Sequence, residues 1–233
     1  MMALADLPAP ARVRKPGAPR RGAPPPGWTR WAKPLVLAAG LAPLARLVYG
    51  VFWNPDLLGA NPAETIEHVT GDWCLQFLLI TLAVTPLRRL SGWNWPIKFR
   101  RMLGLFAFFY GVVHLLAYVG FDMLFDPAAI GKDIWKRPFV TVGFSALLLM
   151  TPLAVTSTKG WVRRLGGPAW ARLHRLVYAI AALGVLHYWW LVKRDITWPV
   201  AYAAMLAALL GWRLWARGRR QKAQAARFGE ARS

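Results

Sequence analysis

Acidic residues, histidine and cysteine are scarce in this 233-residue chain, which has ten Asp and Glu, four His and one Cys against thirty Lys and Arg. The single Cys74 excludes an intrachain disulfide. No GxGxxG or Walker sequence is present, so the chain offers no recognisable nucleotide-binding loop. Apolar side chains are abundant instead, because 56% of the residues are hydrophobic and 14 are Trp.

Six apolar segments follow one another, and each has about 17 to 20 residues, enough to cross a bilayer once. They are approximately Pro34–Phe52, Thr70–Leu87, Met102–Val119, Phe139–Val155, Leu173–Val192 and Trp198–Trp215. The formal charge of +20 comes from clusters between these runs, which does not favour nucleic acid as a partner. The sequence therefore predicts an all-α membrane protein, a six-helix transmembrane bundle in a lipid bilayer.

Basic and acidic residues fall mainly on opposite sides of this predicted bundle. Twenty-four of the thirty Lys and Arg fall in the N-terminal tail, the Arg88–Arg101 loop, the Lys159–Arg175 region and the stretch from Arg213. Eight of the ten acidic residues fall on the other side, and they are Asp56, Glu64, Glu67, Asp72, Asp122, Asp126, Asp133 and Asp195. By the positive-inside rule, both termini are predicted to be cytoplasmic.

Three regions are expected along the chain. Residues 1–33 are basic and rich in Pro, which predicts a disordered cytoplasmic tail. Residues 34–215 form the predicted transmembrane domain, and residues 216–233 form a second basic cytoplasmic tail. The chain is predicted to cross the membrane several times.

Three of the four histidines, His114, His174 and His187, lie within the apolar segments. Ionisable side chains inside a membrane are costly and usually functional, and imidazole is a common ligand of haem iron. His114 and His187 are each expected about 7 to 8 Å below the outer boundary, on parallel helices. Two imidazoles at one depth can hold one iron, and this ligation leaves no vacant position, which favours electron transfer. Because the chain has no CxxCH sequence, the predicted haem is noncovalent and b-type.

His174 lies thirteen residues before His187, about 20 Å away along an ideal helix, and is a candidate ligand for a second, inner haem. Both rings can face one side only if the helix bends, for which Gly184 is the candidate. Arg100 and Arg101 lie at the inner level and could pair with haem propionates or a phosphate. One haem or two remain open, and each histidine has an alternative role in hydrogen bonding between helices. His68 is expected in a solvated outer loop.

Several motifs keep the order and spacing of a known group of membrane proteins, and with them the chain resembles the MsrQ (YedZ) family. They are Glu67-His68-Val69-Thr70-Gly71, Thr85-Pro86-Leu87, Arg100-Arg101-Met102-Leu103-Gly104-Leu105, His114-Leu115, Arg137-Pro138 with Thr141 and Gly143, Thr156-Ser157-Thr158, Trp170 with Leu173-His174 and Tyr178, and His187-Tyr188. The resemblance covers about residues 34–215.

This resemblance implies a ferric-reductase-like transmembrane protein that serves as the haem-binding subunit of a periplasmic protein-methionine-sulfoxide reductase system. The implied partner is MsrP, which carries molybdopterin, and the implied electron donor is the quinone pool or a cytoplasmic flavin reductase. The implied location is a bacterial cytoplasmic (inner) membrane. The family is also described as binding FMN. His114, His174 and His187 match its haem-associated positions. The resemblance implies an electron-transfer subunit, and no substrate site of its own is evident in the sequence.

Two other interpretations remain at this stage. The chain could be an autonomous transmembrane ferric or metal reductase, or an oxidase-like cytochrome, although it has no nucleotide-binding segment to supply electrons. It could also be a membrane scaffold without redox activity, whose histidines only pack between helices. A purified scaffold would be colourless, which separates it from both haem proteins.

Overall fold

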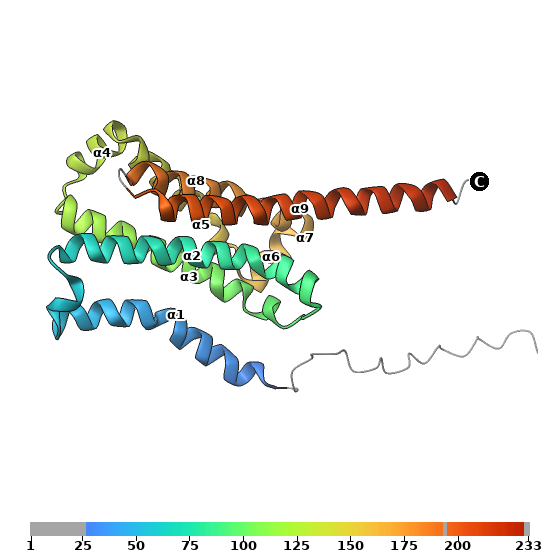
Figure 1. The fold of residues 1–233 in the computed structure, drawn as a ribbon, viewed down its shortest axis with the longest axis horizontal. Helices are drawn as coiled ribbons and strands as arrows, with labels where there is room; N and C mark the ends of the chain where they lie inside the picture. Colours follow the sequence, from blue (N-terminus) through green and yellow to red (C-terminus); the bar gives the residue numbers. More distant parts are fainter. Residues whose placement is uncertain (1–26, 193–194, 231–233) are drawn as a thin grey trace, which may run out of the picture.

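The computed structural model describes residues 27–192 and 195–230, and within them the chain is helical with no strand. Six helical segments in this part are long and apolar enough to cross a membrane, which confirms the predicted all-α architecture with six spans (Figure 1). They are α1 (Thr29–Phe52), α2 (Pro62–Ser91), α3 (Arg100–Ala117) extended by a π-helical turn (Tyr118–Asp122), α5 (Pro138–Val155), the pair α7 (Gly167–Leu173) and α8 (Leu176–Leu191), and α9 (Thr197–Glu230). The orientation of the termini stays a prediction.

Two short helices mark opposite ends of the bundle (Figure 1). The α4 end carries α4 (Pro127–Lys136) and a 3-10 turn, Pro55–Leu58. The α6 end carries α6 (Lys159–Leu165), α7 and another 3-10 turn, Pro96–Lys98. At this end α9 continues well beyond the other spans (Figure 1). Most of the predicted N-terminal tail, residues 1–26, lies outside the described residues.

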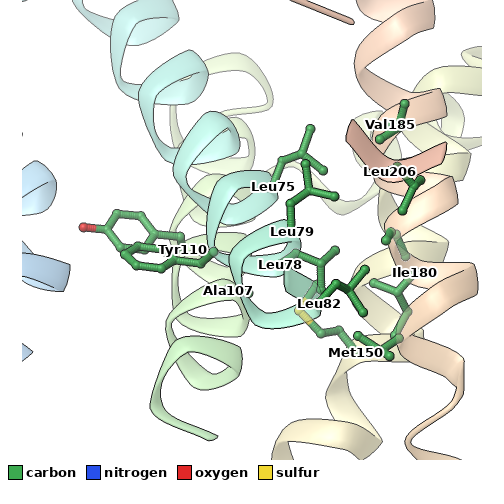
Figure 2. Packing of buried hydrophobic residues seen from close by; sticks show 14 of the residues in the cluster. Leu75, Leu78, Leu79, Leu82, Ala107, Tyr110, Met150, Ile180, Val185 and Leu206 are labelled. Carbon is green, nitrogen blue, oxygen red and sulfur yellow. The ribbon is translucent and has the colours of Figure 1, made fainter. Parts of the chain in front are cut away.

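The core forms where α2 packs against α3, α8 and α9, and α5 contributes further apolar side chains to the same cluster. Figure 2 shows leucines of α2 directed toward the apolar side chains of these neighbours. The labelled members of this cluster are Leu75, Leu78, Leu79, Leu82, Met150, Ile180, Val185 and Leu206. Many other large apolar side chains are exposed on the protein surface, which suits a bundle whose outer faces contact lipid.

Tyr110 of α3 fastens α1 to the bundle. Its hydroxyl donates to the Gly40 carbonyl at 2.8 Å and accepts from the Leu44 amide at 3.2 Å, so it stands between two groups that pair directly in a regular helix. Phe106 packs so closely that a Cβ on Gly40 would lie 2.4 Å from its ring. In Figure 2 the Tyr110 hydroxyl points away from the core, toward α1. Pro43 lies inside the same stretch of α1 and favours a bend there.

The expectation that His68 lies in a loop is wrong, because α2 already begins at Pro62. The Asn61 side chain accepts a hydrogen bond from the Glu64 amide, and a proline in the first turn needs no amide partner. Because of these two features, the helix begins eight residues before Thr70, where the predicted apolar segment starts. His68 is therefore an exposed side chain on α2.

Candidate functional site

His114 of α3 and His187 of α8 lie beside one another near the α4 end. Their ring centres are 6.1 Å apart, and the ring planes are inclined by 79°. Both side chains are half-buried between helices. The structure therefore brings together the two histidines that the sequence predicts at one depth. We refer to them as the paired-histidine site.

The two imidazoles are held by backbone carbonyls of neighbouring helices. His114 Nδ1 donates to the Glu67 carbonyl of α2 at 3.0 Å, and His187 Nδ1 donates to the Phe139 carbonyl of α5 at 2.7 Å. A carbonyl oxygen can only accept, so the hydrogen of each neutral ring lies on Nδ1. Each Nε2 then keeps its lone pair. Histidines that ligate a metal through one ring nitrogen commonly donate from the other nitrogen to a backbone carbonyl, as both rings do here.

A glycine makes room for each ring. A Cβ on Gly71 would lie 3.2 Å from His114 Cε1, and a Cβ on Gly143 would lie 2.6 Å from His187 Nδ1. Each glycine is four residues after the residue whose carbonyl holds the ring, so both lie on the same helical face. The pairs α2–α3 and α5–α8, which pack more extensively than any other helix pair in the described residues, thus hold their histidines in the same way.

The geometry fits two ligands of one metal ion. Two metal–nitrogen bonds of about 2 Å, plus about 1 Å from each nitrogen to its ring centre, separate the centres of two opposed imidazoles by about 6 Å. The observed separation of 6.1 Å agrees with this value. In the part of the chain that the structure describes, no group of three or more His, Cys, Asp or Glu side chains could hold a metal ion. The paired-histidine site suits axial ligation of a haem iron.

His174 lies apart from this pair, at the junction between α7 and α8. Its ring stacks on Trp170 with centres 4.0 Å apart. Thr156 of α5 donates its hydroxyl hydrogen to the Pro152 carbonyl, so its oxygen accepts the hydrogen bond from His174 Nε2 at 3.1 Å. The Trp170 indole also donates to the Thr156 carbonyl at 2.9 Å. In this structure, therefore, His174 Nε2 is engaged within the protein.

The helix is interrupted at His174 and Arg175, whereas Gly184 lies inside the continuous α8. The break in the helix therefore lies at His174 and Arg175 and not at Gly184, the position that the sequence offered as the candidate for a bend. Gly184 instead lets α8 approach Leu75 of α2, because a Cβ there would lie 3.4 Å from the leucine side chain. The interruption separates the environment of His174 from the helix that carries His187.

Comparison with known proteins connects this geometry to a family. A family model described as "Ferric reductase like transmembrane component" matches residues 70–185. Relatives named "Protein-methionine-sulfoxide reductase heme-binding subunit MsrQ" include one from Xanthomonas euvesicatoria pv. vesicatoria (strain 85-10), which is 57% identical over 189 residues and covers 79% of this chain and 86% of the relative. One from Herminiimonas arsenicoxydans is 54% identical over 193 residues, covering 82% and 88%.

The chain belongs to the MsrQ family. The similarity to these relatives confirms the resemblance read from the motifs. The ferric reductase model begins at Thr70 and ends two residues before His187, so it spans α3 and α5 entirely and most of α2 and α8.

The two arginines predicted at the inner level differ in this MsrQ-family chain. Arg100 is half-buried at the start of α3, and its charge interacts with His174 and with Arg213 of α9. Arg101 is exposed. The structure therefore brings Arg100, but not Arg101, into the interior at the α6 end. Any pairing of Arg100 or Arg101 with propionate or phosphate remains a prediction.

Sequence reasoning missed the groups that hold the histidines. Gly71 and Gly143 belong to the motifs that carry the family resemblance, but their contacts with imidazole rings emerge only when helices are paired. The signal was the repeated spacing of four residues, Glu67 to Gly71 and Phe139 to Gly143. Arg213 was likewise interpreted only as one of the basic residues of the C-terminal region.

Proposed function

We propose that this multi-pass membrane protein is a b-type haem subunit that carries electrons across the bacterial inner membrane to a periplasmic methionine-sulfoxide reductase. The observation that carries the proposal is the paired-histidine site, in which two imidazole rings have centres 6.1 Å apart and both Nδ1 atoms are engaged by backbone carbonyls, which leaves the Nε2 atoms as the candidate ligands. A haem held by two histidines supplies a one-electron carrier without an open coordination position. Family membership supports the same assignment, because the MsrQ relatives are named heme-binding subunits.

The protein residues supply position and insulation. The Glu67 and Phe139 carbonyls fix the ring orientations and leave Nε2 available, while Gly71 and Gly143 let the rings approach. The apolar core packed between the helices would limit the access of water to a bound haem, and burial of this kind influences its reduction potential. His174 is the proposed ligand of a second haem. To bind iron through Nε2 it would have to leave Thr156.

Partners and orientation are also part of the proposal. The positive-inside rule places the α6 end in the cytoplasm and the α4 end in the periplasm, so the paired-histidine site lies toward the periplasm. Electrons would enter from membrane quinones or a cytoplasmic flavin reductase and leave toward MsrP, which carries molybdopterin. FMN, implied by the family resemblance, would bind through its phosphate at the basic α6 end.

The test is haem quantification in detergent-purified protein, using pyridine haemochrome and reduced-minus-oxidised spectra. His114→Ala and His187→Ala are each expected to abolish the haem of the paired-histidine site, because one ligand is removed in either case. His174→Ala is expected to keep that haem. The matched control is His68→Ala, which removes an exposed histidine at the same end of the bundle and should retain the wild-type haem content.

The same preparations are then tested for electron delivery to purified MsrP after chemical reduction. His114→Ala and His187→Ala should both fail to reoxidise with MsrP and methionine sulfoxide, whereas His68→Ala should match the wild type. A folded but colourless wild-type protein would reject the haem assignment. Full haem content in either paired-histidine variant would reject the ligand assignment.

A further inference from the structure

Arg213 of α9 enters the interior of the bundle between α2 and α8. Its Nη2 donates to the Leu82 carbonyl at 2.9 Å, and its Nη1 donates to the Tyr178 hydroxyl. The guanidinium carbon lies 4.9 Å from the centre of the Tyr178 ring. The Leu82 carbonyl is available because Pro86, four residues later, has no amide hydrogen to complete the helical bond. Arg213 thus occupies a gap that a proline opens in α2.

Arg213 has no acidic partner in the described part of the chain. The ion pair found among the described residues joins Arg137 and Asp133 instead. The Arg213 Nε is buried and makes no hydrogen bond with any described residue. Arg100 interacts with it electrostatically, and two like charges repel. Eight of the ten acidic residues belong to the opposite side of the predicted topology, and the other two, Asp6 and Glu230, lie near the chain termini. A half-buried cation in these surroundings is costly unless an anion accompanies it.

We propose that Arg213 and Arg100 form a binding site for an oxyanion, a carboxylate or phosphate group, at the α6 end of the bundle. The guanidinium fork matches both groups, which can accept two parallel hydrogen bonds. Arg213 Nε is the donor left for this purpose. Because Tyr178 accepts from Arg213, its own hydroxyl hydrogen can be donated to the same anion.

The anion has two possible sources. Carboxylates would come from the propionates of a second haem near His174, whose ring is within the electrostatic reach of Arg100. This source rests on the proposed function. A phosphate would come from a phosphate ester or a lipid headgroup and is independent of haem. A purely structural role, in which Arg213 only binds the Leu82 carbonyl, predicts no response to either anion.

The test compares detergent-purified full-length wild type with Arg213→Gln and Arg213→Lys. Arg219→Gln is the control, because Arg219 is an exposed cation on the same helix. Two quantities are measured in each protein. They are the amount of haem beyond that of the paired-histidine site, and the melting temperature during titration with inorganic phosphate against sodium chloride of equal ionic strength. The haem signal of the paired-histidine site reports whether each variant is folded.

If the source is a propionate, wild type holds a second haem that Arg213→Gln loses at least fivefold, Arg213→Lys loses in part and Arg219→Gln keeps. If it is a phosphate, phosphate but not chloride raises the wild-type melting temperature, and the half-maximal concentration rises at least tenfold in Arg213→Gln alone. Should Arg213→Gln fail to fold, Arg100→Gln and Tyr178→Phe replace it with the same expectations in weaker form.

The proposal is overturned if folded Arg213→Gln equals Arg219→Gln in both measurements, or if wild type shows neither a second haem nor a specific response to phosphate. Wild type without any haem would end the proposed function but not this inference, because circular dichroism then reports folding and the phosphate titration still decides the site. A second haem that persists unchanged in Arg213→Gln, without a phosphate response, would leave Arg213 a structural residue.

Discussion

At the scale of single residues, the paired-histidine site depends on two glycines as much as on two imidazoles. A carbonyl that already accepts a helical hydrogen bond can also accept one from a histidine only if the ring approaches its helix closely. Gly71 and Gly143 permit that approach. The carbonyl bond in turn fixes the tautomer and makes Nε2 a better ligand.

Gly143→Ala is therefore expected to displace His187, because the new Cβ would lie 2.6 Å from Nδ1. Overpacking of this kind costs about 1 to 3 kcal/mol. We expect at least half of the haem of the paired-histidine site to be lost, as measured by pyridine haemochrome. Gly71→Ala should have a smaller effect, since its closest approach is 3.2 Å.

The control for both variants is Gly211→Ala, because a Cβ at Gly211 meets nothing within 4 Å on another spanning helix. It should keep the wild-type haem content. Equal haem content in Gly143→Ala and Gly211→Ala would mean that the close glycine contact does not position His187.

The two histidines were predictable from sequence because a costly side chain inside an apolar run is visible without any structure. Their partners were not, because a carbonyl has no sequence identity and a glycine has many uses. His174 shows the other limit. Its depth could be calculated, but its hydrogen bond to Thr156 depends on the interruption between α7 and α8.

At the scale of secondary-structure elements, hydropathy located all six spans but not their ends. Helix α2 begins at Pro62 and α9 continues to Glu230, because capping residues and basic helix formers extend both beyond their apolar runs. The short helices α4 and α6 escaped prediction because neither contains an apolar run of spanning length. Helix α1 lies outside the matched family model and is joined to α3 through Tyr110.

Tyr110→Phe is expected to weaken the attachment of α1. It removes the hydroxyl that bridges the Gly40 carbonyl and the Leu44 amide, and one such hydrogen bond contributes about 1 kcal/mol. The free energy of unfolding, measured by titration with a denaturing detergent, should fall by about this amount. The haem content should be unchanged, because Tyr110 does not contact the paired histidines.

Tyr49→Phe is the matched control. Tyr49 is an exposed tyrosine on α1, the helix whose attachment is being tested. Its free energy of unfolding should equal that of wild type. A Tyr110→Phe protein as stable as Tyr49→Phe would show that the bridge contributes nothing to stability.

At the scale of the whole molecule, the charged residues are distributed unequally between the two ends of the helix bundle. Among the described residues, the basic Arg88–Arg101 and Lys159–Arg175 regions lie at the α6 end, and most acidic residues lie at the α4 end, where the paired-histidine site is found. This asymmetry was readable from sequence because each span reverses the chain direction. The contacts of the paired-histidine site could not be predicted from the sequence, because they depend on how α2 packs on α3 and α5 on α8.

The predicted topology is tested with reporters fused to the full chain. Green fluorescent protein after Ser233 should fluoresce, because the C-terminus is expected in the cytoplasm. Alkaline phosphatase inserted after Gly131 of α4 should be active, because this enzyme needs the periplasm. Activity of a phosphatase fused after Ser233 would reverse the orientation and place the paired-histidine site on the cytoplasmic side.

The central claim is that His114 and His187 together ligate one haem iron, and electron paramagnetic resonance of the oxidised protein tests it most directly. The wild type should give a low-spin ferric signal from this site. His187→Gly should lose it, and added imidazole, which can enter the space left by the side chain, should restore it. If the low-spin signal of the paired-histidine site, as distinct from that of any second haem, survived in His187→Gly without imidazole, the claim would be contradicted.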